Sequence, residues 1–193
     1  MAVNLCKGCV FIGTTLDGYI AQKDGNIDFL MDDNNYHKMT DEQKKEDGDR
    51  GFSDFLASVD VVIMGRGTLQ GIPLDHPWIY GDKPVIVLSD TLKELPKEVP
   101  DTVTIRSNVD PVEFMKEMYD KGFKRAYIDG GKVIHNFMKN KVITEMVISV
   151  IPLLLGSGIP LFIGDGSYKE VKLKVDNSKV FHNGIVQTIY TVL

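Results

Sequence analysis

Residues 60–68 constrain the fold of this chain more than any other stretch. The run Val-Val-Ile-Met at 61–64 is short and wholly apolar, which is typical of a fully buried strand in a parallel sheet. It stops abruptly at Gly-Arg-Gly-Thr, residues 65–68. The glycines lack a Cβ, so the backbone can turn sharply and a ligand can approach it, and Thr68 can cap a following helix. The stretch therefore predicts a strand-to-helix junction in an open α/β sheet.

Arg66 makes this junction a candidate binding site. In open α/β sheets, ligands bind at the carboxyl ends of the strands, and the strand at 61–64 delivers a guanidinium group to that edge. A permanent charge with several donors, beside free backbone N–H groups, favours an anionic partner, most simply a phosphate. The alternative is an ordinary tight turn with a surface arginine.

A second junction of the same kind follows later in the chain. Residues 125–129 form a predicted strand, Gly130 and Gly131 come directly after it, and a helix with an apolar stripe follows. The start of that helix offers N–H groups and a positive dipole end to a phosphate, although a plain tight turn is the alternative. Neither the dinucleotide fingerprint nor a Walker loop is complete. The coincidence of two such junctions in one predicted sheet favours a binding site.

Further apolar runs complete an α/β pattern. The other predicted strands are 7–13, 19–21, 84–88, 103–106 and 144–155, with a break at Pro152. The runs 171–181 and 185–193 flank Asn183-Gly184, the strongest short signal for a hairpin. We therefore predict a mostly parallel central sheet with helices on both faces and a C-terminal antiparallel hairpin.

Helix signals fall between these strands. Predicted helices cover 50–58, 68–72 and 110–122, the last with Asp110 as its cap and Pro111 in its first turn. Residues 31–51 are the most polar part of the chain, and we interpret them as a solvated excursion that includes a short helix capped by Thr40 or Asp41.

The composition is that of an ordinary globular protein. Of 193 residues, 43% are hydrophobic and 25% charged, which suits one domain over 1–193. The net charge of -5 and the pI of about 5.4 argue against a nucleic-acid partner, so local donors such as Arg66 must hold an anionic ligand. No apolar run reaches the roughly 20 residues that span a bilayer, and the first residues lack a signal-peptide pattern. We expect no membrane partner and a cytoplasmic location.

Cys6 and Cys9 form a Cys-x-x-Cys spacing that could suggest redox or zinc chemistry. No second pair exists, and the four histidines are scattered without metal-ligand spacing, so we predict no metal site. The pair lies at the start of a strand, where residues three apart point to opposite faces. We expect structural thiols, with a thiol-redox protein as the weaker alternative.

Two loops add candidate residues. The segment 14–21 contains the turn Asp17-Gly18 and could lay a flap over a site, while the Asp17 side chain itself is expected to fix the loop. The loop 74–81 holds Trp78, which either packs on its own loop or forms a wall of a substrate pocket.

Together these segments resemble a known family. Over nearly its whole length the chain is similar to the dihydrofolate-reductase-like fold, and within it to proteins related to the C-terminal reductase domain of the bifunctional riboflavin-biosynthesis deaminase/reductase. The resemblance rests on the closing hairpin and on five segments in the order of the family, namely 15–21, 62–68, 85–89, 128–131 and 151–162. It implies a three-layer fold and a reductase that transfers hydride from NADPH, or from NADH, to a small heterocyclic substrate.

The resemblance also implies which residues hold the cofactor. In the family, the first-strand loop covers the nicotinamide, the Gly-Arg-x-Thr segment holds phosphates, the residues after the next strand lie near the adenosine, and the Gly-Gly helix start cradles the pyrophosphate. The implied cofactor-binding residues are Gly13, Thr14, Ile20, Ala21, Gly65, Arg66, Gly67, Thr68, Leu88, Ser89, Asp90, Gly130, Gly131, Lys132 and Val133. Hydride transfer mainly requires two stacked rings in a dry pocket, so few ionisable groups need stand out, and Asp17 and Asp49 are the only catalytic candidates.

The sequence departs from the family in ways that leave alternatives open. Asp90 lies where the 2′-phosphate of NADPH is expected, so Arg66, with Arg106, would have to outweigh its charge. The Asp-x-Pro-x-Leu-Thr-x-Arg segment tied to the ribose-phosphate substrate is missing, and Asp-His-Pro-Trp at 75–78 stands in its place without the arginine.

Three functions therefore stay open. They are an activity like that of 5-amino-6-(5-phosphoribosylamino)uracil reductase in riboflavin biosynthesis, a pteridine reductase of the dihydrofolate reductase type, and a non-catalytic nucleotide-binding module. For the second, Asp49 and Asp54 lie in the region of the pteridine-binding carboxylate. Relatives of this kind are commonly homodimers, so we also expect a homodimer.

Overall fold

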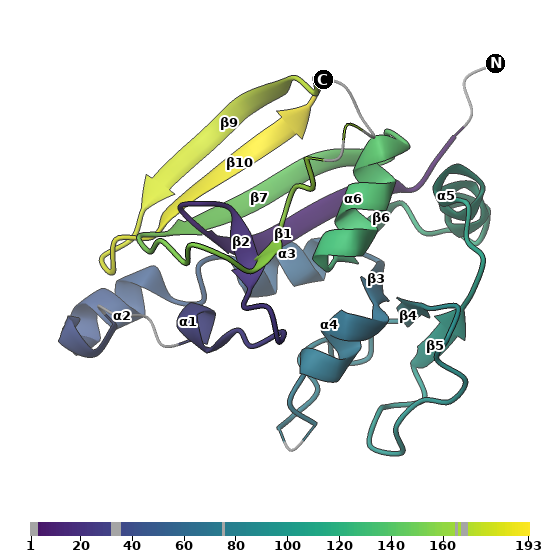
Figure 1. Cartoon of the computed structure of the whole chain (residues 1–193), viewed down its shortest axis with the longest axis horizontal. Helices are drawn as coiled ribbons and strands as arrows, with labels where there is room; N and C mark the ends of the chain where they lie inside the picture. Colours follow the sequence, from purple (N-terminus) through teal and green to yellow (C-terminus); the bar gives the residue numbers. More distant parts are fainter. Residues whose placement is uncertain (1–3, 32–35, 75, 165, 167–169) are drawn as a thin grey trace.

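An eight-stranded sheet forms the centre of the molecule (Figure 1). The computed structural model describes residues 4–31, 36–74, 76–164, 166 and 170–193. The strand order is β5-β4-β3-β6-β1-β7-β10-β9; neighbours are parallel from β5 to β7, and the last two pairs are antiparallel. The strands of this sheet are β1 (Lys7–Thr15), β3 (Val61–Gly65), β4 (Val85–Leu88), β5 (Val103–Arg106), β6 (Arg125–Asp129), β7 (Ile143–Ile151), β9 (Leu173–Val180) and β10 (Val186–Val192). A separate two-stranded sheet pairs β2 (Tyr19–Ala21) with β8 (Ile159–Pro160).

Helices cover both faces of the main sheet. They are α1 (Asp28–Met31), the 3-10 turn η1 (Tyr36–Lys38), α2 (Asp41–Asp47), α3 (Phe52–Ser58), α4 (Arg66–Gly71), α5 (Pro111–Asp120) and α6 (Gly131–Lys139). One hydrophobic layer packs α5 and α6 on the sheet through Phe114 and Phe137, and the other packs α3 and α4 through Phe55 and Leu69. Since successive side chains of a strand point to opposite faces of the sheet, the apolar strands contribute side chains to both hydrophobic layers. The predicted fold, a mostly parallel sheet between helices with a closing hairpin, is confirmed.

The helix after β3 begins earlier than predicted. Gly65 is its N-cap and makes no side-chain cap bond, so the expectation that Thr68 caps this helix is wrong. Gly65 has φ −86° and ψ 163°, which any residue can adopt, so the turn does not require a glycine here for backbone freedom. The strand passes directly into the helix because tertiary packing, rather than a cap, fixes the junction.

Two other boundaries differ from the predictions. The helix expected at 50–58 begins at Phe52, because the Asp49 carboxylate accepts the N–H groups of Gly51 and Ser53 and so fixes the first turn. The strand expected at 144–155 ends at Ile151, directly before Pro152, which has no N–H to continue a ladder.

The polar excursion 31–51 is docked rather than wholly solvated. Of the two predicted caps, Thr40 is the one that caps α2, and Asp41 is its first helical residue. At the other end of α2, the Asp47 side chain is only 3% exposed and lies 2.8 Å from Nδ1 of His182. The His182 N–H donates to the same carboxylate at 2.9 Å. This contact ties α2 to the turn between β9 and β10; residues 32–35, with the acidic pair that opens the excursion, lie outside the described residues.

The two cysteines are free thiols in separate layers. Cys6 packs in the layer of α5 and α6, and Cys9 in the layer of α3 and α4, so the predicted opposite facing is confirmed. Burial raises the pKa of Cys6 to about 12 and that of Cys9 to about 11. The reactive form of a thiol is the thiolate, so these values favour a structural role.

Candidate functional site

The two glycine junctions are neighbours at one edge of the sheet. Strands β3 and β6 are paired in parallel, with Met64 opposite Asp129, so both chains leave the sheet side by side. A Cβ built on Gly130 would lie 2.3 Å from the Thr68 hydroxyl oxygen, and Gly130 has φ +89°. Both facts require glycine, because a side chain would clash and the left-handed conformation would be strained. The close approach of the two junctions thus depends on Gly130.

A flap made of β2 and β8 covers the second junction. A Cβ on Gly131 would lie 2.9 Å from the Ile20 side chain and 3.1 Å from the Pro160 carbonyl. A Cβ on Gly158 would lie 2.3 Å from the Ala21 carbonyl, so the two flap strands are themselves in close contact. In Figure 1 this small sheet lies between the end of β1 and α6. The predicted flap residue Ile20 is therefore brought to Gly131, while Ala21 contacts Gly158 within the flap.

The first junction, in contrast, leaves backbone accessible. Gly67 is exposed, and a Cβ built there would meet nothing within 4 Å. Gly65 is closer to the second junction, since its Cβ would lie 3.2 Å from the Val133 side chain. No contact within the described part of the chain explains a glycine at 67, so the exposed space beside its Cα is open to a ligand.

Arg66 and the end of β4 form a cationic corner beside this open backbone. Leu88 pairs with Gly65 in the sheet, which brings the residues after β4 next to Arg66. The exposed Arg66 guanidinium donates to the Thr91 hydroxyl at 2.8 Å, and no carboxylate of the described residues is paired with it. The Ser89 hydroxyl accepts the Leu92 N–H at 3.0 Å. The corner therefore combines an unneutralised cation with two hydroxyl groups.

The other two charges expected near this corner are already engaged. The Asp90 carboxylate accepts the Asn108 N–H at 2.8 Å. Arg106 forms two hydrogen bonds with Glu117, at 3.0 and 2.9 Å, and so points toward α5. Arg106 is thus not the cation that offsets Asp90, and Arg66 is the one at the corner.

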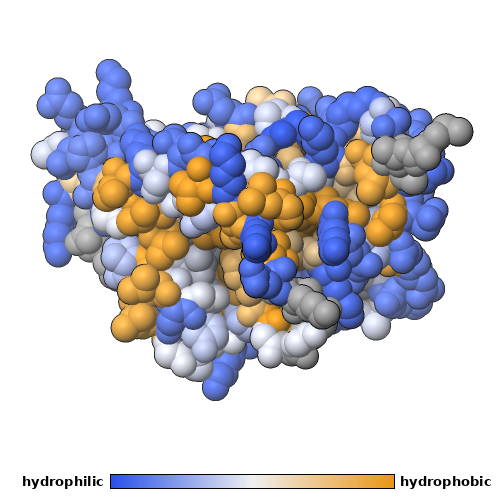
Figure 2. Space-filling model, turned by 90° about the horizontal axis from the view of Figure 1, so that it is seen from above, coloured by the Kyte–Doolittle hydropathy of each residue, from blue (hydrophilic) through white to orange (hydrophobic). Residues whose placement is uncertain are grey.

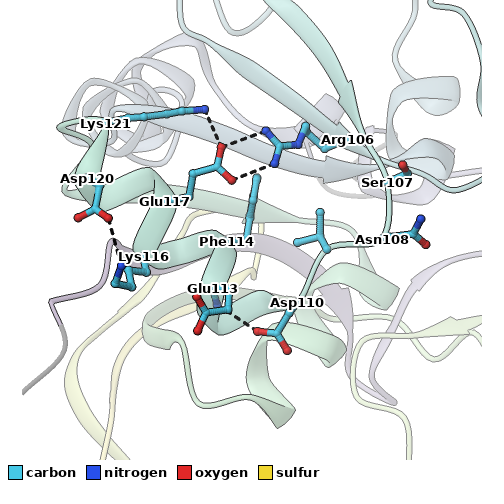
Figure 3. Close-up of a pocket in the computed structure, with 11 residues that line it drawn as sticks. Arg106, Ser107, Asn108, Asp110, Glu113, Phe114, Lys116, Glu117, Asp120 and Lys121 are labelled. Atoms are coloured by element: carbon cyan, nitrogen blue, oxygen red, sulfur yellow. Dashed lines mark hydrogen bonds and ion pairs between the residues drawn. The ribbon is translucent and has the colours of Figure 1, made fainter.

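A hollow of about 580 Å³ lies between the end of β5 and α5. Figure 3 shows that its charged side chains pair with one another: Glu117 lies between Arg106 and Lys121, and Lys116 contacts Asp120. Its three cations are thus paired with carboxylates of the same wall, and Asp110 caps α5, so these side chains are engaged within the protein.

Asp129 is a polar residue of the site that sequence reasoning overlooked. It ends β6 directly before the two glycines, and it keeps part of its surface accessible. Its carboxylate accepts the Gly130 N–H at 2.8 Å and the Tyr80 hydroxyl at 3.4 Å. Surrounding protein displaces water from the carboxyl group and raises its pKa to about 6, against the opposing effect of these hydrogen bonds. The sequence does contain a signal for this residue, because an acidic side chain lies directly between an apolar predicted strand and the pair Gly130-Gly131.

Aromatic side chains line the region beside Asp129. Tyr80 contacts Trp78 edge-on at 5.4 Å between ring centres and Tyr127 at 6.3 Å. The Trp78 Nε1 is buried and has no hydrogen-bond acceptor among the described residues. Trp78 therefore packs on Tyr80 of its own loop, and through Tyr80 it adjoins the candidate site; Asp75, which opens the Asp-His-Pro-Trp segment, lies outside the described residues.

The structure places the two catalytic candidates away from the glycine junctions. Asp17 accepts the Thr15 hydroxyl at 2.5 Å and the N–H groups of Leu155 and Gly156, so it fastens the flap loop to the segment after β7. The Thr15 hydrogen bond holds the pKa of Asp17 below its usual value. Asp49 fixes the start of α3, as described above. Both carboxylates are thus committed to local structure.

The remaining predicted residues lie near these elements. Gly13 packs against Leu30, where its Cβ would lie 3.3 Å from the side chain, and the Thr14 hydroxyl donates to the carbonyl of Thr15. Lys132 is exposed on the first turn of α6. Within the described ranges, no three His, Cys, Asp or Glu side chains gather in a metal-binding group, and no helix there is long and apolar enough to cross a membrane.

Comparisons with known proteins agree with this fold. The family model described as the RibD C-terminal domain matches residues 7–187. A Bacillus subtilis (strain 168) protein named uncharacterized protein YwjB is 33% identical over 181 residues, covering 93% of this chain and 94% of its own. A second protein of that strain, uncharacterized protein YyaP, is 28% identical over 192 residues, covering 93% and 91%.

Solved structures give the same result. One from Shewanella sp. PV-4, whose name places it provisionally in riboflavin biosynthesis, has a TM-score of 0.83 and 38% identity, and the match covers 97% of this chain and 99% of that one. Acinetobacter baumannii RibD matches with a TM-score of 0.70 at 16% identity, over 100% of this chain and 60% of its own, and at that identity it shows the fold alone.

Proposed function

The chain belongs to the family of RibD C-terminal domains, and from that premise we propose that it is a cytoplasmic reductase that uses NADPH to reduce a small heterocyclic molecule. The observation that supports this most is the adjacency of the two glycine junctions at one sheet edge. A dinucleotide carries two linked phosphates and needs contiguous N–H donors, which Gly67 and the start of α6 offer in neighbouring positions.

The proposed cofactor is NADPH rather than NADH because of the cationic corner. The extra phosphate of NADPH is attached to the adenosine ribose, and the residues after β4 are the proposed adenosine end. Arg66, with the Ser89 and Thr91 hydroxyls, offers a cation and neutral hydrogen-bonding groups to such a phosphate. The Asp90 carboxylate is engaged by the Asn108 N–H, which reduces its repulsion of an anion.

The substrate side of the proposed site lies toward Asp129 and the aromatic residues. When bound, the reduced nicotinamide supplies the hydride. The flap residue Ile20 excludes water above Gly131, and the half-buried Trp78 ring, which packs on the buried Tyr80, offers a face for a flat heterocycle. Asp129 can accept a hydrogen bond from a ring N–H or, in its protonated form, donate one, since its pKa of about 6 places both forms near neutral pH.

Arg66→Ala tests the cofactor assignment. Loss of a charge-assisted hydrogen bond costs about 1.5–3 kcal/mol, so we expect the Kd for NADPH to rise by roughly 10- to 150-fold. NADH binding should change much less, since that cofactor lacks the phosphate. Trp78 emission during titration of each cofactor gives both constants. Arg106→Ala is the matched control. Because Arg106 is bound to Glu117, this substitution should leave the dissociation constants for NADPH and NADH unchanged. If Arg66→Ala weakens the binding of NADPH and NADH equally, Arg66 does not bind the extra phosphate of NADPH.

Turnover separates the reductase from its alternatives. The decrease of NADPH absorbance is followed with 5-amino-6-(5-phosphoribosylamino)uracil, dihydrofolate and simpler pyrimidines and pteridines. Oxidation with any of these supports a reductase and identifies the ring, whereas tight NADPH binding without oxidation across the panel favours the non-catalytic nucleotide-binding module. Because residues 75–78 lack the arginine tied to the ribose-phosphate, we expect simpler heterocycles to be tolerated.

A further inference from the structure

Three polar side chains share the sheet face that α3 and α4 cover. A ligand site is marked by a few placed polar groups rather than by apolar surface, which is widespread here: seen from above, hydrophobic residues form a belt across the molecule (Figure 2). Asp129 lies two residues after Tyr127 in β6, and Tyr127 belongs to the layer of α3 and α4. Ser149 lies two residues after Val147 of the same layer, and Gln187 is paired with Ser149. Polar groups on one face thus continue from Asp129 toward β10.

The hydrogen bonds of Gln187 fix the orientation of its amide group. Its Nε2 atom donates to the Arg50 carbonyl oxygen at 3.1 Å and to the Ser149 hydroxyl oxygen at 3.0 Å. A backbone carbonyl oxygen can only accept, so the amide nitrogen has to face Arg50, and both of its hydrogens are used. The Oε1 atom of Gln187 receives no hydrogen bond from the described residues. It is also not among their buried unpaired atoms, so it keeps accessible surface.

Ser149 adds a donor beside this acceptor. The residue is only 9% exposed and lies in the apolar strand β7. Its hydroxyl oxygen accepts the Gln187 N–H, while its own hydrogen has no acceptor among the described residues. A hydroxyl group carries one hydrogen to donate as well as lone pairs to accept. An unused donor therefore lies next to the unused acceptor of Gln187.

The chain that leads into α3 is held against this polar pair. Arg50 has φ 57°, a left-handed conformation that strains a residue with a Cβ, and the Gln187 hydrogen bond fixes its carbonyl group. Such strain is typical of ligand sites. Two residues later, the half-buried Phe52 ring lies 5.5 Å from the half-buried Phe11 ring and 6.5 Å from that of Tyr127, between ring centres. These rings connect the polar pair to the aromatic cluster beside Asp129.

We propose that Gln187 and Ser149 determine which rings the site accepts, by binding a ring edge that carries an N–H donor beside an acceptor. This inference rests on the proposed function, because it places the ring on the side of Asp129. The Gln187 Oε1 accepts the ring N–H, and the Ser149 hydroxyl donates to the neighbouring ring acceptor. Two kinds of edge supply that pair, a lactam N–H beside its carbonyl and an amino group beside a ring nitrogen.

Three pteridines test this selectivity. Lumazine offers only lactam edges, 2,4-diaminopteridine offers only amino edges, and 1,3-dimethyllumazine has no N–H at all. A site that hydrogen-bonds a ring N–H rejects an analogue without it, because its own acceptor is left unpaired. We expect lumazine or 2,4-diaminopteridine to bind at least about 10-fold more tightly than 1,3-dimethyllumazine, as measured by calorimetric titration without cofactor. The tighter of the two identifies the edge.

Gln187→Met and Thr188→Val are matched substitutions at adjacent residues of β10. Methionine has nearly the length of glutamine, so it still excludes N-methyl groups by size but offers no amide oxygen. We therefore expect the 10-fold preference to fall to about twofold or less in Gln187→Met. Thr188 points to the opposite face, where its hydroxyl lies 3.1 Å from that of Ser178, and Thr188→Val should keep the full preference. Ser149→Ala should reduce the preference while leaving the Gln187 contact with Arg50 in place. Thermal melting confirms that the variants are folded.

The ratio between ligands is the decisive readout, because a purely structural role of Gln187 would weaken the binding of every ring alike. An unchanged ratio in Gln187→Met would overturn the proposal, and so would equal binding of methylated and unmethylated rings by the wild type. Failure of all three pteridines to bind at millimolar concentration would overturn it as well. The titrations contain no NADPH, so a protein that binds these rings selectively but not NADPH would contradict the proposed reductase and leave this inference standing.

Discussion

Three glycines at the junctions carry different physical requirements, although they are alike in the sequence. Gly130 is needed by the fold, because its φ is +89° and a Cβ would meet the Thr68 hydroxyl at 2.3 Å. Gly131 is limited mainly by the Ile20 side chain, which can shift. Gly67 has no such contact among the described residues and no special backbone angle. A ligand that approaches the backbone gives Gly67 a reason to be glycine.

Gly67→Ala therefore separates stability from binding. In α4 the change should raise the free energy of unfolding by about 0.5–1 kcal/mol, since alanine is the better helix former. It should at the same time weaken NADPH binding, because the methyl group would occupy the proposed phosphate approach. Denaturant unfolding and cofactor titration measure the two effects.

Gly130→Ala is the comparison, and it should lose stability by about 1–3 kcal/mol together with binding. If Gly67→Ala binds NADPH as tightly as wild type, the phosphate does not approach at Gly67.

Asp129 should leave a signature in the pH dependence of stability. Its pKa is raised to about 6 in the folded protein, above the unfolded value, so the folded state binds the proton more strongly. Stability should therefore fall as pH rises from about 4 to 6 and then level off, by on the order of 3 kcal/mol, because one pKa unit is worth about 1.4 kcal/mol.

Asp129→Asn should remove that decrease, as measured by urea unfolding at a series of pH values with wild type in parallel. The amide does not titrate, so any dependence that Asp129 causes has to disappear in this variant. If the stability of Asp129→Asn still falls over the same range, the proton belongs to another group.

At the scale of elements, apolar patterns predicted strands well and polar patterns predicted less. The runs at 61–64 and 84–88 predict strands because a parallel strand covered on both faces has to be apolar throughout, and the second strand begins one residue later than predicted, after Pro84. The start of α4 was missed because no local cap defines it. Asp47 was read as solvated because its partner, His182, lies 135 residues away in the sequence. Burial of a single carboxylate depends on such distant contacts and leaves no local signal.

The docking of α2 can be tested at Asp47. Asp47→Ala removes the carboxylate that accepts the backbone N–H of His182, so that N–H loses its acceptor. We therefore expect the free energy of unfolding to fall by about 1–3 kcal/mol. Glu46 is the control, because it is 70% exposed and lies 3.7 Å from the same imidazole. Glu46→Ala should change stability by less than about 0.5 kcal/mol. Similar losses in both variants would show that the Asp47 contact does not hold α2.

For the whole molecule, one continuous sheet lies between the two hydrophobic layers and contributes side chains to both. Strands β1 and β7, nine residues each, join the glycine junctions to the hairpin in the same ladder. We therefore predict a single cooperative melting transition for 1–193, with equal calorimetric and van't Hoff enthalpies. Two separate transitions, or a calorimetric enthalpy well above the van't Hoff enthalpy, would mean that the part of the sheet near the hairpin and the part near the glycine junctions unfold independently.

Cys6 and Cys9 give each side of the sheet its own internal reporter. A thiol reagent cannot reach either sulfur in the native molecule, and neither sulfur ionises readily, so labelling records the moments when a layer comes apart. Mass spectrometry of partly labelled chains would then tell which layer opens first. If Cys6 and Cys9 are labelled at the same rate, both layers open together. If one cysteine is labelled faster, unfolding begins in the layer that contains it.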